Sequence, residues 1–186
     1  MLEKTRQQIV EETVEFTEEF PLYRIILENV IFWFMVLLGA LGFYQIRVQG
    51  FDYPIFTFIF LGYSLYMLLY HLRKKSCIHC YYYGKNCHLG WGKLASRFYS
   101  KGDPEEFMRD EASFQSYWDY WGTKAPIIAM VASLIFAFNY WMLTNLLLFV
   151  GLNFFMMKYF GKYVCIHCKM RGVCFFARRI LGESIA

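Results

Sequence analysis

The sequence predicts an all-α membrane protein, a four-helix bundle built from two transmembrane hairpins that are each followed by a cysteine motif. The 186 residues are 58% hydrophobic and 22% aromatic but only 18% charged, whereas about a quarter of the residues in soluble domains are charged. Two long apolar regions occur along the chain, and the motif C-I-H-C follows each of them. This composition excludes a disordered tail, a collagen-like rod and a disulfide-dense secreted domain.

The first apolar region, residues 23–72, predicts a transmembrane hairpin. It is too long for a single crossing of the bilayer core, which takes about 20 helical residues. We therefore expect spans at 25–44 and 55–72. The turn between them is marked by Gly50, Asp52 and Pro54, which are residue types that favour turns.

The second apolar region, residues 125–163, predicts another hairpin. Pro126 marks a helix start, because proline is favoured in the first turn of a helix. We expect spans at 127–138 and 146–163 with a turn at 139–145. A single kinked helix is the alternative. About 40 residues at 1.5 Å each would give roughly 60 Å of helix, twice the thickness of a bilayer core, so two spans are favoured.

Polar segments flank these hairpins. Residues 2–20 predict an amphipathic cytosolic helix, because apolar residues recur on one face of an acidic segment. Asp103 and Pro104 predict the start of a second cytosolic helix that runs to Tyr120. The expected units are residues 1–22 (cytosolic helix), 23–72 (hairpin 1), 73–124 (cytosolic loop with the first motif), 125–163 (hairpin 2) and 164–186 (cytosolic tail with the second motif).

The basic residues predict the orientation in the membrane. All of the 19 Lys and Arg residues except Arg47 fall on one side of the predicted spans. By the positive-inside rule, both termini and the loop at 73–124 face the cytoplasm of a multi-pass cell-membrane protein. The N-terminal segment lacks a basic start followed by an apolar core, so we expect no cleavable signal peptide.

The cysteines carry the main functional signal, because all six fall into the two motifs. Each motif reads C-I-H-C and is followed by Gly four residues after its second Cys, with a third Cys at seven residues in one copy and six in the other. The motif residues are Cys77, His79, Cys80 and Cys87 in the first copy and Cys165, His167, Cys168 and Cys174 in the second. This pattern predicts an internal duplication about an axis along the membrane normal, which would bring the motifs together.

Two arrangements of a metal site satisfy this spacing. In one, two C-x-x-C turns face each other and supply four thiolates from Cys77, Cys80, Cys165 and Cys168 to a shared tetrahedral site. In the other, each motif forms its own site from three Cys and one His, which would be His79 or His88 in the first copy and His167 in the second. The expected cofactor is zinc, or iron in a mononuclear site or an iron–sulfur cluster, since thiolates accept both metals.

Other readings of the cysteines stay open, and the sequence does not decide whether the protein is an enzyme. A metal site of iron would suit electron transfer with membrane quinone, and zinc would suit a non-catalytic scaffold. A metal-free thiol–disulfide oxidoreductase is an alternative, because paired cytosolic Cys are more often metal or redox sites than structural disulfides. Cysteines can also be inert apolar residues.

Polar residues within the spans are a further signal. Glu28 and Asn29 in the first span, with Asn145 and Asn153 in or near the fourth, are candidates for an ion or quinone path. Hydrogen bonding between helices is the alternative role for the Asn residues. As partners we expect the lipid bilayer and a soluble or membrane protein on the cytosolic face, and no nucleic acid.

Overall fold

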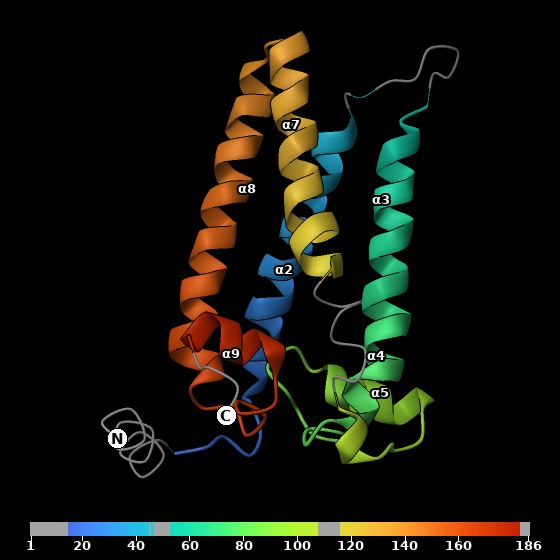
Figure 1. Cartoon of the computed structure of the whole chain (residues 1–186), viewed down its shortest axis with the longest axis vertical. Coiled ribbons are helices and arrows are strands. Elements are labelled where there is room, and N and C mark those ends of the chain that lie inside the picture. Colours follow the sequence, from blue (N-terminus) through green and yellow to red (C-terminus); the bar gives the residue numbers. More distant parts are fainter. Residues whose placement is uncertain (1–14, 45, 47–52, 108–115, 183–186) are drawn as a thin grey trace.

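The computed structural model describes residues 15–44, 46, 53–107 and 116–182, and the regular secondary structure within them is helical. This confirms the all-α class for the described part of the chain. Four helices stand side by side along the long axis of the molecule (Figure 1): α2 (Leu22–Tyr44), α3 (Ile55–Leu65), α7 (Ala125–Phe136) and α8 (Tyr140–Tyr159). Helix α2 occupies the centre, because it packs against each of the other three.

Two of these helices continue beyond their α-helical parts and end at the cysteine motifs. Helix α3 runs on through a π-helical segment, η1 (Tyr66–His71), and α4 (Leu72–Lys75) to a 3₁₀ turn, η2 (Cys77–His79). Helix α8 runs on through a second π-helical segment, η5 (Phe160–Cys165). Both continuations end at the same end of the molecule, where α5 (Trp91–Phe98) and α9 (Phe175–Leu181) also lie (Figure 1). The two motifs are therefore neighbours in space.

Within the described part of the chain, three helices are long and apolar enough to cross a membrane. They are Leu22–Tyr44, Ile55–His79 and Tyr140–Cys165, with 23, 25 and 26 residues. The predicted spans at 25–44, 55–72 and 146–163 fall within them. The third predicted span, at 127–138, corresponds to α7, which has only 12 residues and is preceded by the polar segment η4 (Tyr117–Lys124). A membrane bundle of four crossings and an internal duplication thus stay predictions.

The turn between α7 and α8 is shorter than the sequence suggested. Residues 139–145 were expected to form it, but α8 begins at Tyr140. The reason is a side-chain cap: Asn139 Oδ1 accepts a hydrogen bond from the backbone N–H of Trp141 at 2.9 Å, which satisfies one of the free donors at a helix start. The polar residues after Asn139 consequently lie within the helix.

Two predicted cytosolic helices fall partly outside the described residues. Of the helix expected at 2–20, residues 2–14 lie outside, and residues 15–20 are not helical. Asp103 does cap a helical turn, since its Oδ1 accepts the N–H of Glu105 at 3.0 Å, but that turn, η3 (Pro104–Glu106), is a single 3₁₀ turn and residues 108–115 lie outside the description.

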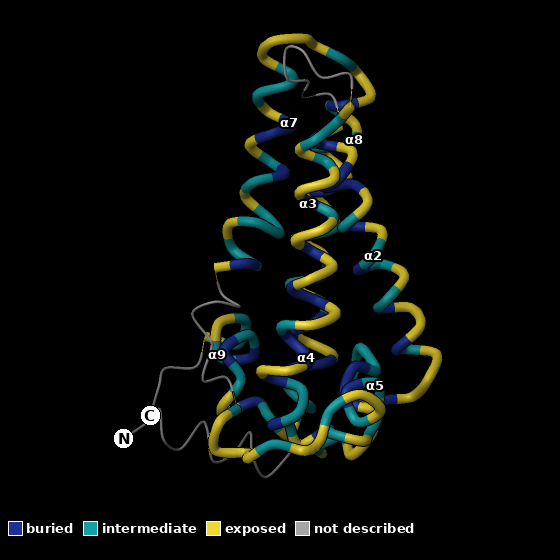
Figure 2. Tube along the Cα trace, turned by 90° about the vertical axis from the view of Figure 1, so that its right-hand side faces the viewer, coloured by how far each residue is buried: buried dark blue, intermediate teal, exposed yellow. Residues whose placement is uncertain are grey.

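Close contacts on α2 hold the helices together. A Cβ atom at Gly42 would lie 2.8 Å from Met130 Cγ, and one at Gly39 would lie 3.0 Å from Phe60 Cζ. Glycine at these positions therefore permits α7 and α3 to approach α2 closely. Buried and exposed residues alternate along each helix (Figure 2), because one side of the helix faces its neighbours and the other faces outward. The exposed residues of α2 include apolar ones, namely Leu27, Val30, Phe34, Leu37 and Leu41.

Candidate functional site

The two C-I-H-C segments form turns with matching hydrogen bonds. In the first, the N–H of Cys80 donates to Cys77 O at 3.4 Å. In the second, the N–H of Cys168 donates to Cys165 O at 3.3 Å. The residue three positions after each second Cys also donates back to that Cys, at 3.0 Å in both turns. The same local sequence thus produces the same local geometry at the end of two helices.

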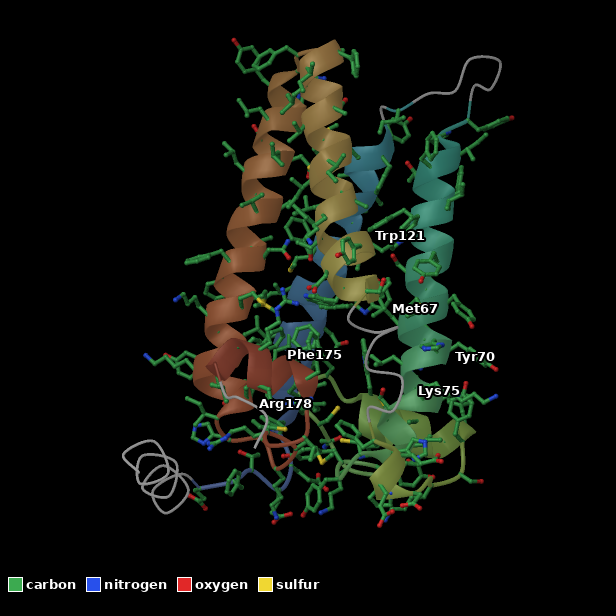
Figure 3. All side chains as sticks on the ribbon, in the orientation of Figure 1. Met67, Tyr70, Lys75, Trp121, Phe175 and Arg178 are labelled. Carbon is green, nitrogen blue, oxygen red and sulfur yellow. The ribbon has the colours of Figure 1, made fainter. Side chains whose placement is uncertain are left out.

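All six cysteines line one cavity of about 190 Å³ between these turns. They are Cys77, Cys80, Cys87, Cys165, Cys168 and Cys174. The remaining wall is largely aromatic and aliphatic, and includes Phe32, Trp91, Phe160 and Val164. Sulfur atoms gather at this end of the molecule, below Phe175 and between α9 and α5 (Figure 3). None of these six described cysteines forms a disulfide.

Burial raises the pKa of several of these thiols, which favours their protonated form. Desolvation raises the pKa of Cys80 to about 12 and that of Cys168 to about 11. It also raises the pKa of Cys87. A smaller contribution comes from the other thiols: Cys80 is affected by Cys87 and Cys168. Cys80 and Cys168 line the same cavity and pack against the same buried cluster, so residues of the two motifs are neighbours here.

Backbone N–H groups point at the same sulfurs. The N–H of Gly92 donates to Cys87 Sγ at 3.4 Å. Backbone hydrogen bonds from Tyr82 and Met170, each two residues after its cysteine, lower the pKa values of Cys80 and Cys168 against the larger effect of desolvation. Such donors stabilise a negatively charged sulfur. The cavity therefore opposes a free thiolate but would support one whose charge is neutralised by a cation.

The donor set fits a thiolate-ligated metal better by chemistry than by present geometry. Soft thiolate ligands select zinc and iron–sulfur centres. Among the described residues, no group of three or more His, Cys, Asp or Glu side chains is arranged as it would be around one ion. The sulfurs instead surround a volume. This distribution suits a group larger than a single ion, or requires the thiols to turn inward on binding.

His79 and His167, which the sequence placed among the ligands, do not line this cavity. His79 Nδ1 lies 2.6 Å from the carbonyl oxygen of Asp103, and His167 Nδ1 lies 3.1 Å from that of Glu15. Each imidazole thus fixes a neighbouring segment of backbone to its turn. Their role as ligands stays a prediction.

His88 is the histidine that does line the cavity. Its Nδ1 lies 2.9 Å from Glu28 Oε2. Glu28 has no exposed surface and also pairs with Arg24 at 3.3 Å. The sequence signalled this pair only in part, through a carboxylate in an apolar span and a histidine directly after Cys87.

The asparagines of the spans bind backbone carbonyl groups. Asn29 Nδ2 donates to Leu89 O at 3.0 Å, which ties the loop after Cys87 to α2. Asn145 Nδ2 donates to Leu38 O at 3.1 Å, and Asn153 Nδ2 donates to a carbonyl of its own helix at 2.9 Å. Only the bond of Asn145 joins two neighbouring helices, α8 and α2, which accords with a structural role.

The N-terminal segment at 15–20 joins the two turns. Glu18 pairs with Lys169 in the second turn and with Lys85 after the first, at 3.4 Å for Lys85. Its hydrogen bond with Lys169 is the main reason that its pKa falls to about 2. Tyr82 OH also donates to Thr17 O at 2.7 Å. The segment therefore helps to hold the cysteine turns against each other.

Taken together, these residues form a largely apolar cavity with six soft donors, one imidazole and several sulfur-directed N–H groups. These are donor types that soft metal centres accept. No protein family, curated protein or solved structure matched the chain in the comparisons made.

Proposed function

We propose that this chain is a multi-pass membrane protein that binds one thiolate-ligated metal centre in its cysteine cavity and transfers electrons at the membrane. The observation that carries the proposal is that all six cysteines line a single cavity. Six thiols from two motifs 88 residues apart would not meet in this way if each motif were an independent structural turn. The proposal favours the shared site over one site in each motif.

The membrane part of the proposal rests on three apolar helices and their exposed apolar faces. A fourth crossing would be made by η4 and α7 together, since α7 packs on α2 and α8. Basic residues lie at the cysteine end, as in the run Arg73 to Lys75 and at Lys158 and Lys162. This distribution supports a cytoplasmic location for the cysteine cavity and for both termini.

The size of the cavity favours a polynuclear iron–sulfur centre over a single zinc ion. A zinc ion needs four donors about 2.0–2.3 Å from one point, whereas these sulfurs line a volume of about 190 Å³. When bound, such a centre would supply one-electron chemistry. The chain's own groups would supply thiolate ligands, hydrogen bonds from backbone N–H groups to sulfur, and apolar walls that keep water out.

Raised thiol pKa values weigh against the alternative of a metal-free thiol–disulfide enzyme. The reactive species in that chemistry is the thiolate, and burial raises the pKa of Cys80 and Cys168 to about 12 and about 11. A structural zinc site remains the second candidate, because the same soft donors bind it.

The test is the metal content and visible spectrum of protein purified without oxygen. We expect iron with sulfur-to-iron charge-transfer absorption. The Cys168→Ser variant should lose most of the metal and colour. Val173→Ser is the matched control, because Val173 is 55% exposed and lies in the same motif but is not a thiol. Colourless protein with zinc would favour a scaffold, and wild-type protein without metal would overturn the proposal.

Orientation can be tested with two new thiols in a pair of variants. Ser100 is an exposed residue at the cysteine end, and Ala137 is an exposed residue in the turn between α7 and α8. In intact cells, a membrane-impermeant maleimide should label the Ala137→Cys variant and leave Ser100→Cys unlabelled. The reverse pattern would overturn the proposed topology.

A further inference from the structure

A buried carboxylate lies directly beside the cysteine cavity. Glu28, on α2, has no exposed surface. It pairs with Arg24 at 3.3 Å and with His88 Nδ1 at 2.9 Å, and Tyr159 OH donates to it at 3.5 Å. A carboxylate in an apolar helix is costly, and such residues are usually retained for function. The three partners offset that cost and fix its position.

His88 connects this carboxylate to the cavity. It follows Cys87 in the chain and lines the cavity wall. The rings of Phe20 and Phe160 lie edge-on to the imidazole, with centroids 6.2 Å and 5.4 Å away. Its Nδ1 faces the carboxylate at 2.9 Å. In the tautomer with the proton on Nδ1, this nitrogen donates a hydrogen bond to Glu28 and leaves the lone pair of Nε2 for a ligand.

An imidazole that donates one N–H to a carboxylate is the usual form of a metal-bound histidine, because the carboxylate fixes the tautomer and orients the ring. The other two motif histidines also have a partner at Nδ1, a backbone carbonyl oxygen in each case. They differ from His88 because neither lines the cavity.

We infer that His88 supplies a nitrogen ligand, alongside the cysteine thiolates, to the metal centre in the cavity, and that Glu28 is its positioning residue. The inference rests on the proposed function, because it assumes that the cavity holds a metal. It places one ligand in the loop after the first motif, outside the duplicated C-I-H-C sequence. The centre would therefore be asymmetric even though the two turns are alike.

X-ray absorption at the edge of the metal bound to the purified full-length protein tests this inference. The wild type should show a nitrogen scatterer at about 2.0–2.1 Å beside sulfur at about 2.3 Å. His88→Ala should lose the nitrogen and keep most of the sulfur shell. His167→Ala is the matched control, and should keep both, because this histidine lies outside the cavity.

Glu28 is tested by the affinity for the same metal, measured by chelator competition. Loss of a partner of this kind lowers metal affinity by about 10–100-fold, and we expect this for Glu28→Leu. Glu28→Gln should recover part of it, because the amide oxygen can still accept from Nδ1–H. A merely structural role would give equal losses for the two variants.

The outcomes separate the two proposals. Wild-type protein that binds metal through sulfur alone would overturn the role of His88 and leave the cysteine centre standing, and this result needs no variant to fold. Loss of the nitrogen scatterer in His167→Ala instead of His88→Ala would overturn it too. Wild-type protein without metal would overturn both.

Discussion

Replacing Gly92 by alanine is expected to weaken the loop that carries Cys87. A Cβ atom at Gly92 would lie 2.9 Å from the carbonyl carbon of Tyr82 and 3.0 Å from the carbonyl oxygen of Lys85, with the Tyr82 oxygen closer still. These are backbone atoms, which cannot turn aside as a flexible side chain can. Helix α5 would have to move away from the loop, and the N–H that now donates to Cys87 Sγ at 3.4 Å would move with it.

The clash outweighs the gain in helix propensity. Overpacking of this kind costs about 1–3 kcal/mol, whereas alanine in place of glycine in a helix returns at most about 1 kcal/mol. With a net loss of about 1–2 kcal/mol, the thermal midpoint of a chain of this size should fall by about 2–8 °C. The assay is thermal unfolding of the purified protein in detergent, followed by circular dichroism, with the metal content measured on the same sample.

Gly172→Ala is the matched control. Gly172 lies in the second motif, has no atom within 4 Å of an added Cβ, and lacks a positive φ. The free energy of unfolding of this variant should therefore differ from that of the wild type by no more than about 0.5 kcal/mol, as for a neutral surface change. A Gly92→Ala protein that melts with the wild type and retains full metal would show that close packing of α5 on this loop does not hold Cys87.

Two predictions concern pH. Because contact with Lys169 lowers the pKa of Glu18 from its usual 4.5 to about 2, its stabilisation is present above 4.5 and is lost as the pH falls through about 2. Glu18→Gln should remove that part of the acid dependence of the thermal midpoint. Identical acid profiles for variant and wild type would refute the stabilising role of the Glu18–Lys169 pair. In metal-free protein, alkylation of Cys80 and Cys168 by iodoacetamide should be slow near neutral pH. It should accelerate as the pH approaches the raised pKa of each thiol, about 12 for Cys80 and about 11 for Cys168. Rapid labelling at neutral pH would show that these thiols are reactive thiolates.

The meeting of the two motifs could be predicted from the sequence, because each follows an apolar helix and the two helices run in the same direction. The three candidate spans could also be predicted, because length and apolar composition are visible in the sequence. Helix ends were less predictable. Asn139 reads equally well as a turn residue or as a cap, and only its hydrogen bond to Trp141 shows that it begins α8.

The direction of each imidazole could not be predicted. His79 and His167 lie between ligand-type cysteines in sequence, yet each binds a carbonyl oxygen in a distant segment, Asp103 or Glu15. The contact of His88 with Glu28 joins residues 60 positions apart. Motif spacing carries information on neighbouring side chains within a turn, but such long-range contacts depend on how α2 packs against the loop.

The central claim is that all six cysteines surround one metal centre in each chain. Native mass spectrometry of protein purified without oxygen tests it directly, because the mass added to the polypeptide gives both the identity and the number of bound groups. We predict a single added mass per chain, matching one iron–sulfur cluster, and its loss in Cys80→Ser as well as in Cys168→Ser. Two independent additions, each removed by the variant in one motif only, or no addition in the wild type, would contradict it.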